Sequence, residues 1–268
     1  MSLRICLAGA TGWAGSALAR GIARTTDLQL VAAVSRGAAG RSLGDALGEP
    51  ALAGVPVHAT AAQALAVPCD VFVEYTKPDA ARANVLAALA SGANVVVGTS
   101  GLTDADYADI DQVARARGRG VLACGNFALT VALLQKFALL AARVLPQWEI
   151  IDYASDRKRD APSGTARELA ARLGEGRPPA HTVPVEDTVG PREARGATLG
   201  GTQVHSVRLP GHTLGVDVVF GLPDETLTLR HVAGTSAEPY VGGALLAIRK
   251  VVGRVGVTRG LDRVLDDL

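Results

Sequence analysis

The chain has 268 residues, of which 48% are hydrophobic and 20% are charged, and its formal net charge is +1 at pH 7. A chain of this length can bury a large core, and we expect two domains rather than one. Because positive and negative residues are interspersed, neither nucleic acid nor a membrane surface is an expected partner. There is no charged and apolar leader and no apolar run of about 18 residues, so we expect a cytoplasmic protein.

Three cysteines, Cys6, Cys69 and Cys124, are scattered without CxxC spacing. Two of them lie in apolar, strand-like runs, which favours buried free thiols over a disulfide framework. This usage is typical of a reducing compartment. We expect no metal site.

A glycine-rich loop follows the first expected strand. The run from Leu3 to Ala8 is mostly apolar, and after the loop apolar residues recur at helical spacing. Strand, glycine turn and helix form the context of a dinucleotide fingerprint, in which glycines permit a tight turn, close approach of the pyrophosphate and close helix packing. Glycine-rich turns are common, so the position of this loop is what favours a cofactor. The expected cofactor-binding residues here are Gly9, Ala10, Thr11, Gly12, Trp13, Ala14 and Gly15.

The second expected strand, Leu28 to Val34, ends at Ser35 and Arg36, about 20 residues past the glycines. A carboxylate at this position would bind the ribose 2′-hydroxyl of NAD, whereas a hydroxyl followed by an arginine accommodates the 2′-phosphate of NADP. Ser35 and Arg36 therefore predict NADPH, with NADH as the alternative. The other interpretation of Arg36 is a solvated loop residue.

Strands and helices continue to alternate as far as Cys124, a pattern that predicts an α/β fold with a Rossmann-type, doubly wound parallel sheet. Ligands of such sheets bind outside the carboxyl ends of the strands. Three polar or glycine-bearing segments follow expected strands there, and we expect them to line the cofactor. Their residues are Tyr75 and Thr76, then Gly98, Thr99 and Ser100, and finally Gly125, Asn126 and Phe127.

The pattern changes after an apolar helix that begins near Leu129. Four strand-like runs with a single helix between the first two predict an α+β domain with a mixed sheet. A long loop rich in Gly and Pro is expected over 174–201, and a final helix near 239–254 precedes a charged tail. We expect a dinucleotide-binding domain at 1–127, completed by about 237–268, and a substrate-binding and oligomerisation domain at 128–236. The expected strands are 148–154, 203–207, 215–220 and 225–231, with the helix at 164–173.

A basic loop joins the first of these strands to that helix. It runs from Lys158 through Asp160 and Pro162 to Ser163, Gly164 and Thr165. The N–H groups of a first helical turn lack intrahelical partners, and the helix dipole favours anions there. With Lys158 nearby, the loop indicates a site for a substrate that carries carboxylates. The alternative is an ordinary N-cap, with Ser163 or Thr165 capping the helix and the basic residues solvated.

Over nearly its whole length the chain resembles the 4-hydroxy-tetrahydrodipicolinate reductases (dihydrodipicolinate reductases) of lysine and diaminopimelate biosynthesis. The glycine loop, the three strand-end segments and the run from Lys158 to Thr165 carry the resemblance. It implies that Lys158 is catalytic or substrate-binding, that Ser163, Gly164 and Thr165 bind a substrate carboxylate, and that NAD(P)H is the cofactor. It further implies a homotetramer built through the second domain, and a final helix that returns to the cofactor domain.

Two departures from the family pattern stand out. The family has a His-His pair four and three residues before the signature lysine, and its first histidine is assigned as the proton donor; here these positions hold Ala154 and Ser155. Neither side chain is a general acid near neutral pH, so water, Lys158 or Asp156 would have to substitute. The family's cofactor-contacting arginine is also not found in the segment 234–240.

Three hypotheses follow. The first is an NAD(P)H-dependent reductase of a cyclic dicarboxylate imine-type substrate. The second is a paralogous imine reductase or amine dehydrogenase with a different substrate, which Ala154 and Ser155 keep open. The third is a non-catalytic dinucleotide-binding homologue, and the presence of Lys158 with Ser163, Gly164 and Thr165 argues against it.

Overall fold

The computed structural model describes residues 2–267, and the chain divides into two compact units. The first unit contains the residues up to Leu129 together with those from Ala237 onward. The second unit is Thr130–Ser236. The C-terminal segment therefore folds with the N-terminal one, although more than a hundred residues separate them in the sequence.

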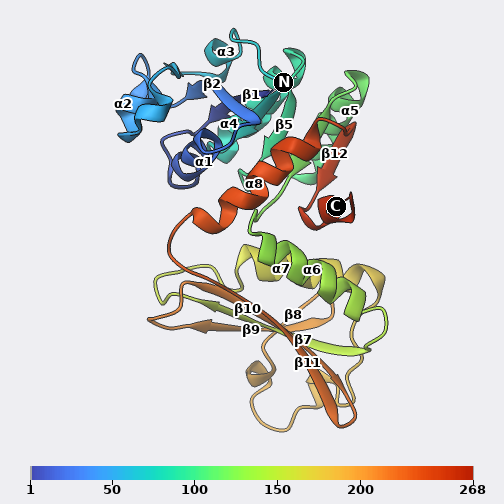
Figure 1. Cartoon of the computed structure of the whole chain (residues 1–268). Coiled ribbons are helices and arrows are strands. Elements are labelled where there is room, and N and C mark those ends of the chain that lie inside the picture. The colour runs from blue at the N-terminus through green and yellow to red at the C-terminus, as the bar shows by residue number, and fades with distance from the viewer. Residues whose placement is uncertain (1, 268) are drawn as a thin grey trace. The chain divides into compact units, whose positions relative to one another are not determined.

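The first unit is built on a seven-stranded sheet in which every pair of neighbours is parallel (Figure 1). Its strands are short runs of Val, Leu, Ile and Ala that are buried on both faces, as parallel sheets require. The strand order is β12-β6-β5-β4-β1-β2-β3. From β1 the chain adds strands toward one edge as far as β3, and from β4 it adds them toward the other edge, as in doubly wound folds. The strands are β1 Leu3–Ala8, β2 Leu28–Val34, β3 Val57–His58, β4 Val71–Glu74, β5 Asn94–Val97, β6 Gly120–Ala123 and β12 Gly256–Arg259.

Helices cover both faces of this sheet. Alternate strand residues such as Cys6 and Val95 join one buried cluster with residues of α4 and α5. On the other face α1 and α8 pack side by side (Figure 1), so closely that a Cβ at Gly21 would lie 2.3 Å from a methyl carbon of Val241. The helices are α1 Trp13–Ala23, α2 Leu43–Leu47, α3 Ala61–Ala64, α4 Pro78–Ala90, α5 Asp104–Ala116 and α8 Glu238–Val251.

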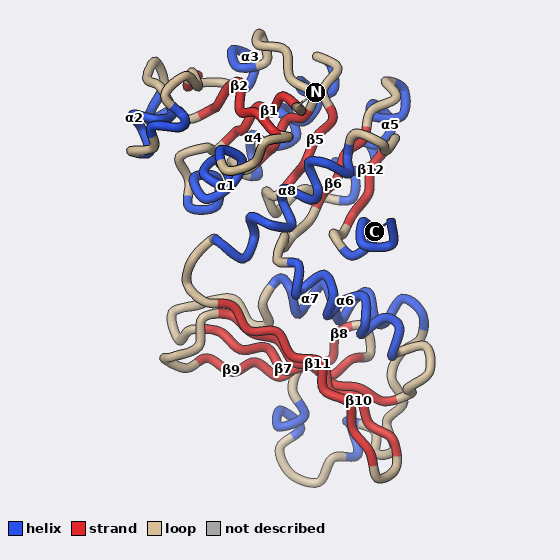
Figure 2. The backbone as a smooth tube through the Cα atoms, in the orientation of Figure 1, coloured by secondary structure: helices blue, strands red, loops and turns tan. Residues whose placement is uncertain are grey.

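The second unit is a five-stranded mixed sheet with the order β11-β10-β7-β9-β8. Only β7 and β9 run parallel; the other pairs are antiparallel. Two helices lie against one face (Figure 2), where Trp148, Ile150 and Phe220 from alternate strand positions form the core. The elements are α6 Leu129–Ala141, β7 Gln147–Ala154, α7 Gly164–Gly176, β8 Ala197–Leu199, β9 Thr202–Arg208, β10 Leu214–Leu222 and β11 Glu225–Ala233.

Three expectations about elements need correction. The expected charged tail contains β12, which extends the sheet beside β6, and the final helix ends at Val251 rather than near residue 254. The expected loop over 174–201 begins inside α7, holds two 3₁₀ turns and ends in β8. Three short strands, β3, β8 and β12, were not predicted, and each is stabilised by pairing with a neighbouring strand.

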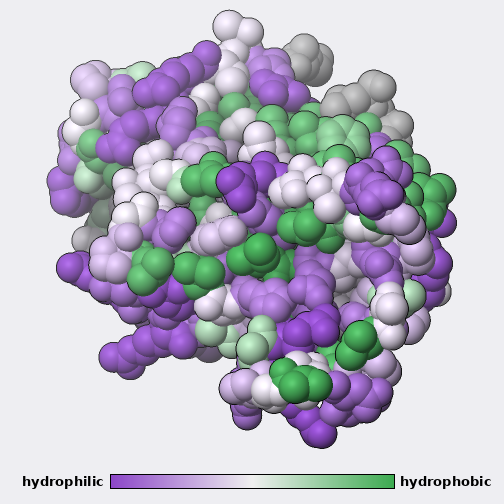
Figure 3. Space-filling view, turned by 90° about the horizontal axis from the view of Figure 1, so that it is seen from below, coloured by the Kyte–Doolittle hydropathy of each residue, from purple (hydrophilic) through white to green (hydrophobic). Residues whose placement is uncertain are grey.

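On the side seen in Figure 3, green hydrophobic patches lie among purple hydrophilic ones. Within residues 2–267, no helix combines the length and the apolar character that crossing a bilayer demands. Cys6 and Cys124 are buried and Cys69 is half-buried, and none of the three forms a disulfide.

Candidate functional site

Two positions in the glycine loop of the first unit, Gly9 and Gly15, have no room for a side chain. Gly9 has a φ of +78°, and a Cβ there would lie 2.2 Å from the carbonyl oxygen of Tyr75. A Cβ at Gly15 would lie 2.1 Å from the carbonyl oxygen of Gly9. Gly12 precedes α1 without any side chain to cap it, so the first-turn N–H groups remain for an anion. These residues therefore fit the pyrophosphate of a dinucleotide.

The end of β2 is tied to this loop. The hydroxyl oxygens of Thr11 and Ser35 are 2.6 Å apart, and Ser35 precedes a 3₁₀ turn that begins at Arg36. Arg36 is exposed, and it forms no ion pair among the described residues. A hydroxyl and a free guanidinium thus occupy the position at which a 2′-phosphate is recognised.

A buried carboxylate organises the next two strand ends. Glu74 ends β4 with 0% of its surface exposed, and it accepts hydrogen bonds from the Thr76 N–H at 2.7 Å and from the Asn84 amide at 2.8 Å. The hydroxyls of Thr76 and Thr99 also donate to it. The two predicted threonines therefore turn their hydroxyls inward and fix the shape of the strand-end turns. Sequence reasoning gave Glu74 no role of its own; a single acidic residue at the end of an apolar strand was the available signal.

The other predicted strand-end residues divide into packed and exposed ones. The rings of Tyr75 and Phe127 are 5.8 Å apart, and a Cβ at Gly98 would lie 2.2 Å from the Tyr75 ring. The Tyr75 hydroxyl has no hydrogen-bond partner among the described residues, and burial raises its pKa. Ser100 and Gly125 are exposed, and Asn126 is half-buried and accepts a hydrogen bond from the Ala128 N–H.

In the second unit, the basic loop meets the start of α7. Ser163 caps this helix, because its hydroxyl accepts a hydrogen bond from the Ala166 N–H. The space beside Gly164 is open, since the atom nearest to a Cβ placed there would be an Arg167 nitrogen at 3.9 Å. The Lys158 ammonium lies 2.8 Å from Asp160 Oδ1, which holds the pKa of Asp160 below its usual value. A cation and an open helix N-terminus thus belong to one loop, as an anion site requires.

The histidines were the residues that sequence could not place. His231 is buried in β11, bonds to the Thr130 hydroxyl at 2.9 Å, and has a pKa lowered by burial. His205 contacts Glu149 at 2.8 Å, on the sheet face away from the helices. Ala154 ends β7 with 0% exposure, so its side chain is a buried methyl group.

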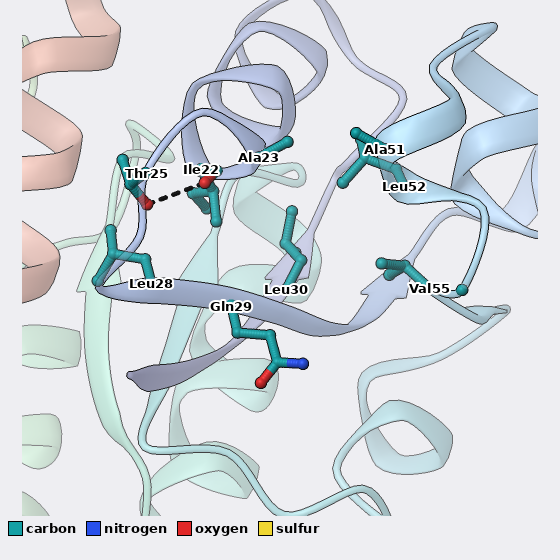
Figure 4. A pocket seen from close by; sticks show the side chains of 10 residues that line it. Ile22, Ala23, Thr25, Leu28, Gln29, Leu30, Ala51, Leu52 and Val55 are labelled. Carbon is teal, nitrogen blue, oxygen red and sulfur yellow. Dashed lines mark hydrogen bonds between the residues drawn. The ribbon is translucent and has the colours of Figure 1, made fainter. Parts of the chain in front are cut away.

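A hollow of about 300 Å³ lies elsewhere in the first unit, beside the first residues of β2 (Figure 4). Ile22, Leu28, Leu30, Leu52 and Val55 line it together with the polar residues Thr25 and Gln29. It borders the amino end of β2, whereas Ser35 follows the carboxyl end, so it is separate from the cofactor cradle.

Within residues 2–267, no group of three or more His, Cys, Asp or Glu side chains could hold a metal ion.

A parallel sheet with a dinucleotide cradle, together with a mixed-sheet unit that carries a cationic loop, defines the class of two-domain dinucleotide-dependent oxidoreductases. Two sequence profiles match the chain: the N-terminal part of dihydrodipicolinate reductase over residues 3–127, and its C-terminal part over residues 130–265. The chain belongs to the dihydrodipicolinate reductase family.

Full-length relatives agree with this assignment. The 4-hydroxy-tetrahydrodipicolinate reductase of Moorella thermoacetica is 38% identical, over 99% of this chain and 98% of that protein. That of Streptococcus pneumoniae is 36% identical, over 99% of this chain and 100% of that protein.

Solved structures agree as well. A dipicolinate-bound dihydrodipicolinate reductase from Paenisporosarcina superposes with a TM-score of 0.85 at 30% identity, covering 98% of this chain and 99% of that one. An amine dehydrogenase from Mycobacterium smegmatis, with a TM-score of 0.67 at 18% identity and covering 98% of this chain and 96% of that one, shares the fold.

Proposed function

We propose that this protein is an NAD(P)H-dependent reductase of a cyclic dicarboxylate imine-type substrate, namely 4-hydroxy-tetrahydrodipicolinate. The observation that carries the proposal is that Lys158 and the open α7 N-terminus belong to one loop, in a chain that matches reductases of this substrate over its full length. The product would enter lysine and diaminopimelate biosynthesis.

The first unit supplies the cofactor site. Gly9, Gly12 and Gly15 admit the pyrophosphate, and Ser35 with Arg36 favours NADPH over NADH. Bound there, the cofactor supplies a hydride from its nicotinamide ring. The strand-end segments flank the same edge of the sheet, and we assign the nicotinamide half to them: Tyr75, Thr76, Gly98, Thr99, Ser100, Gly125, Asn126 and Phe127.

The second unit supplies the substrate site and the oligomer contact. Lys158 and the first turn of α7, with Ser163, Gly164 and Thr165, would hold carboxylates of the substrate and so orient the carbon that is reduced. The dipicolinate-bound relative supports a dicarboxylate ligand for this fold. We further propose a cytoplasmic homotetramer built through the sheet face opposite α6 and α7, where a hollow of about 440 Å³ includes Ile151 and Val219.

This protein would differ from the rest of its family in how the substrate receives a proton. Ala154 and Ser155 stand where the family has two histidines, so the proton for the reduced carbon would come from water, Lys158 or Asp156. General acid catalysis is typically worth about 10²–10⁴-fold, which sets the scale of the loss. The same two residues favour a second candidate function, reduction of a different imine or the reverse oxidation of an amine.

The test is oxidation of NADPH and of NADH by the purified protein with freshly generated 4-hydroxy-tetrahydrodipicolinate, beside a panel of other cyclic imines with one or no carboxylate. The proposal expects turnover on the dicarboxylate above every other imine. Turnover confined to another imine would establish the second candidate, and cofactor binding without any turnover would indicate a non-catalytic homologue.

A further inference from the structure

A single buried carboxylate lies beneath the basic loop. Asp152 is on the central strand β7, two residues before Ala154, and 0% of its surface is exposed. Its Oδ2 accepts hydrogen bonds from the Ser163 N–H at 2.8 Å and from the Ser206 hydroxyl at 3.4 Å. Residues 155–162 thus leave β7 just after this carboxylate and return to it at the cap of α7. The hydrogen bond from the Ser163 N–H to Asp152 Oδ2 therefore links the two ends of this loop.

One guanidinium neutralises this carboxylate. Arg208 ends β9, the strand that pairs in parallel with β7, and its Nη2 lies 2.7 Å from Asp152 Oδ2. Its side chain is only 16% exposed. A buried carboxylate without a cation is strongly unfavourable, so this pair is mutually required.

The same guanidinium reaches the loop itself. Arg208 Nη2 also donates to the carbonyl oxygen of Asp160 at 2.8 Å, and Nη1 donates to the carbonyl oxygen of Asp152 at 3.3 Å. The side chain of Asp160 holds the Lys158 ammonium at 2.8 Å. A continuous set of charge-assisted contacts therefore runs from Asp152 through Arg208 and Asp160 to Lys158.

We propose that Arg208 and Asp152 are positioning residues that preorganise Lys158 and the α7 N-terminus for the substrate's carboxylates. This inference rests on the proposed function, because it names the residues that shape its substrate site. With the loop held in place, ordering Lys158 costs little when the substrate binds; with the loop free, that cost appears as weaker binding. The effect falls on substrate affinity, because neither residue contacts the reacting atoms.

The chain offers a matched control. Arg230 forms a two-pronged pair with Asp217, at 2.7 Å and 2.5 Å, on the opposite face of the same sheet. Asp217 is 2% exposed, so Arg230→Ala also removes a guanidinium from a buried aspartate. A loss that was merely structural would affect Arg208→Ala and Arg230→Ala alike, whereas positioning affects only the former.

The experiment measures three quantities for the full-length wild type, Arg208→Ala, Arg208→Lys and Arg230→Ala. These are the Kd of dipicolinate by calorimetry, KM and kcat with 4-hydroxy-tetrahydrodipicolinate, and the rate at which an N-hydroxysuccinimide ester acetylates Lys158 relative to Lys77. Arg208→Ala should raise Kd and KM at least about tenfold, as for loss of a charge-assisted contact, with a smaller change in kcat and a faster relative acetylation of Lys158.

Arg208→Lys should recover only part of the affinity, because an ammonium cannot reproduce the fork between Asp152 and Asp160. Arg230 lies on the sheet face proposed for the tetramer, so the oligomeric state of this variant is measured alongside; at the wild-type oligomeric state, Arg230→Ala should leave all three quantities near the wild-type values. Equal losses in Arg208→Ala and Arg230→Ala, or an unchanged Kd and an unchanged acetylation ratio in Arg208→Ala, would overturn the inference. If the wild type fails to reduce the substrate, the proposed function fails, yet the dipicolinate and acetylation measurements still decide the role of Arg208.

Discussion

The hydroxyl oxygens of Thr11 and Ser35 lie 2.6 Å apart, so the glycine loop after β1 is hydrogen-bonded to the residue that follows β2. This contact places a hydroxyl where a carboxylate would select NAD, and it fixes the start of the turn that carries Arg36. We therefore expect these two adjacent side chains to determine cofactor selectivity.

Arg36→Ala should weaken NADPH binding by about tenfold and leave NADH binding nearly unchanged, because only NADPH carries the 2′-phosphate. The measurement is a titration of both cofactors by quenching of Trp13, whose side chain is exposed on the glycine loop. Ser35→Asp is the complementary variant and should shift the preference toward NADH. A clear preference of the wild type for NADH would contradict the prediction, and unchanged NADPH affinity in Arg36→Ala would show that Arg36 is a solvated loop residue.

Lys158→Ala should lower kcat/KM for the dicarboxylate substrate at least about tenfold, mainly through KM, because a charge-assisted contact contributes roughly 1.5–3 kcal/mol. Cofactor Kd should not change, since Lys158 belongs to the second unit. Steady-state kinetics over a range of substrate concentrations separates the two constants. An unchanged kcat/KM in this variant would mean that Lys158 is a solvated loop residue and that the start of α7 is an ordinary N-cap.

Ala154→His should raise turnover on 4-hydroxy-tetrahydrodipicolinate, with a gain approaching about 10²-fold, the lower bound for general acid catalysis. The structure indicates that the same substitution lowers stability. Ala154 is fully buried, and overpacking a buried position typically lowers the free energy of unfolding by about 1–3 kcal/mol. Kinetics and thermal melts of the variant, beside Ser155→His at the half-buried neighbour, test both parts. A flat response on this substrate together with a loss on another imine would favour the second candidate function.

The free energy of unfolding should fall as pH drops below neutrality, because burial lowers the pKa of His231 from its usual value of about 6.5. Between the lowered pKa and about 6.5 the unfolded chain binds more protons than the folded one, so stability rises with pH in that window. His231→Gln should flatten this dependence.

Denaturant unfolding from about pH 5.5 to about pH 7.5 measures the slope in that window. Thr130→Val serves as the control, because it removes the hydroxyl that bonds His231 while leaving the buried imidazole that causes the shift. It should lower stability throughout and keep the slope. An unchanged slope in His231→Gln would assign the dependence to other groups.

The spacing of apolar residues and the positions of Gly and Pro predicted five of the seven strands and the long helices of the first unit, but not β3 or β12. The bounds of β2, Leu28–Val34, follow directly from an apolar run between polar residues. β12 could not be seen in the same way, because Gly256–Arg259 is short and partly charged. It forms a strand through pairing with β6 and through a hydrogen bond from the Val257 N–H to Asp111.

The candidate site was only half visible in the sequence. Lys158 and the cap of α7 are neighbours in the chain, so a local pattern reveals them. Asp152 and Arg208 are 56 residues apart, and their contact exists only because β7 and β9 pair in register. Glu74 likewise accepts a hydrogen bond from Thr99 only because β5 pairs with β4 and brings Thr99 beside it. Contacts of this kind arise from tertiary pairing, which no local pattern encodes.

The central claim is that this chain delivers a hydride to 4-hydroxy-tetrahydrodipicolinate without the family's histidine pair. The most direct measurement is mass spectrometry of the product formed from that substrate with NADPH deuterated at the transferable position. We expect tetrahydrodipicolinate that carries one deuterium, formed in step with cofactor oxidation as the substrate's hydroxyl leaves as water, and formed at least about tenfold more slowly by Lys158→Ala at low substrate concentration. Unlabelled substrate recovered intact, with deuterium appearing instead in a different imine's product, would contradict it.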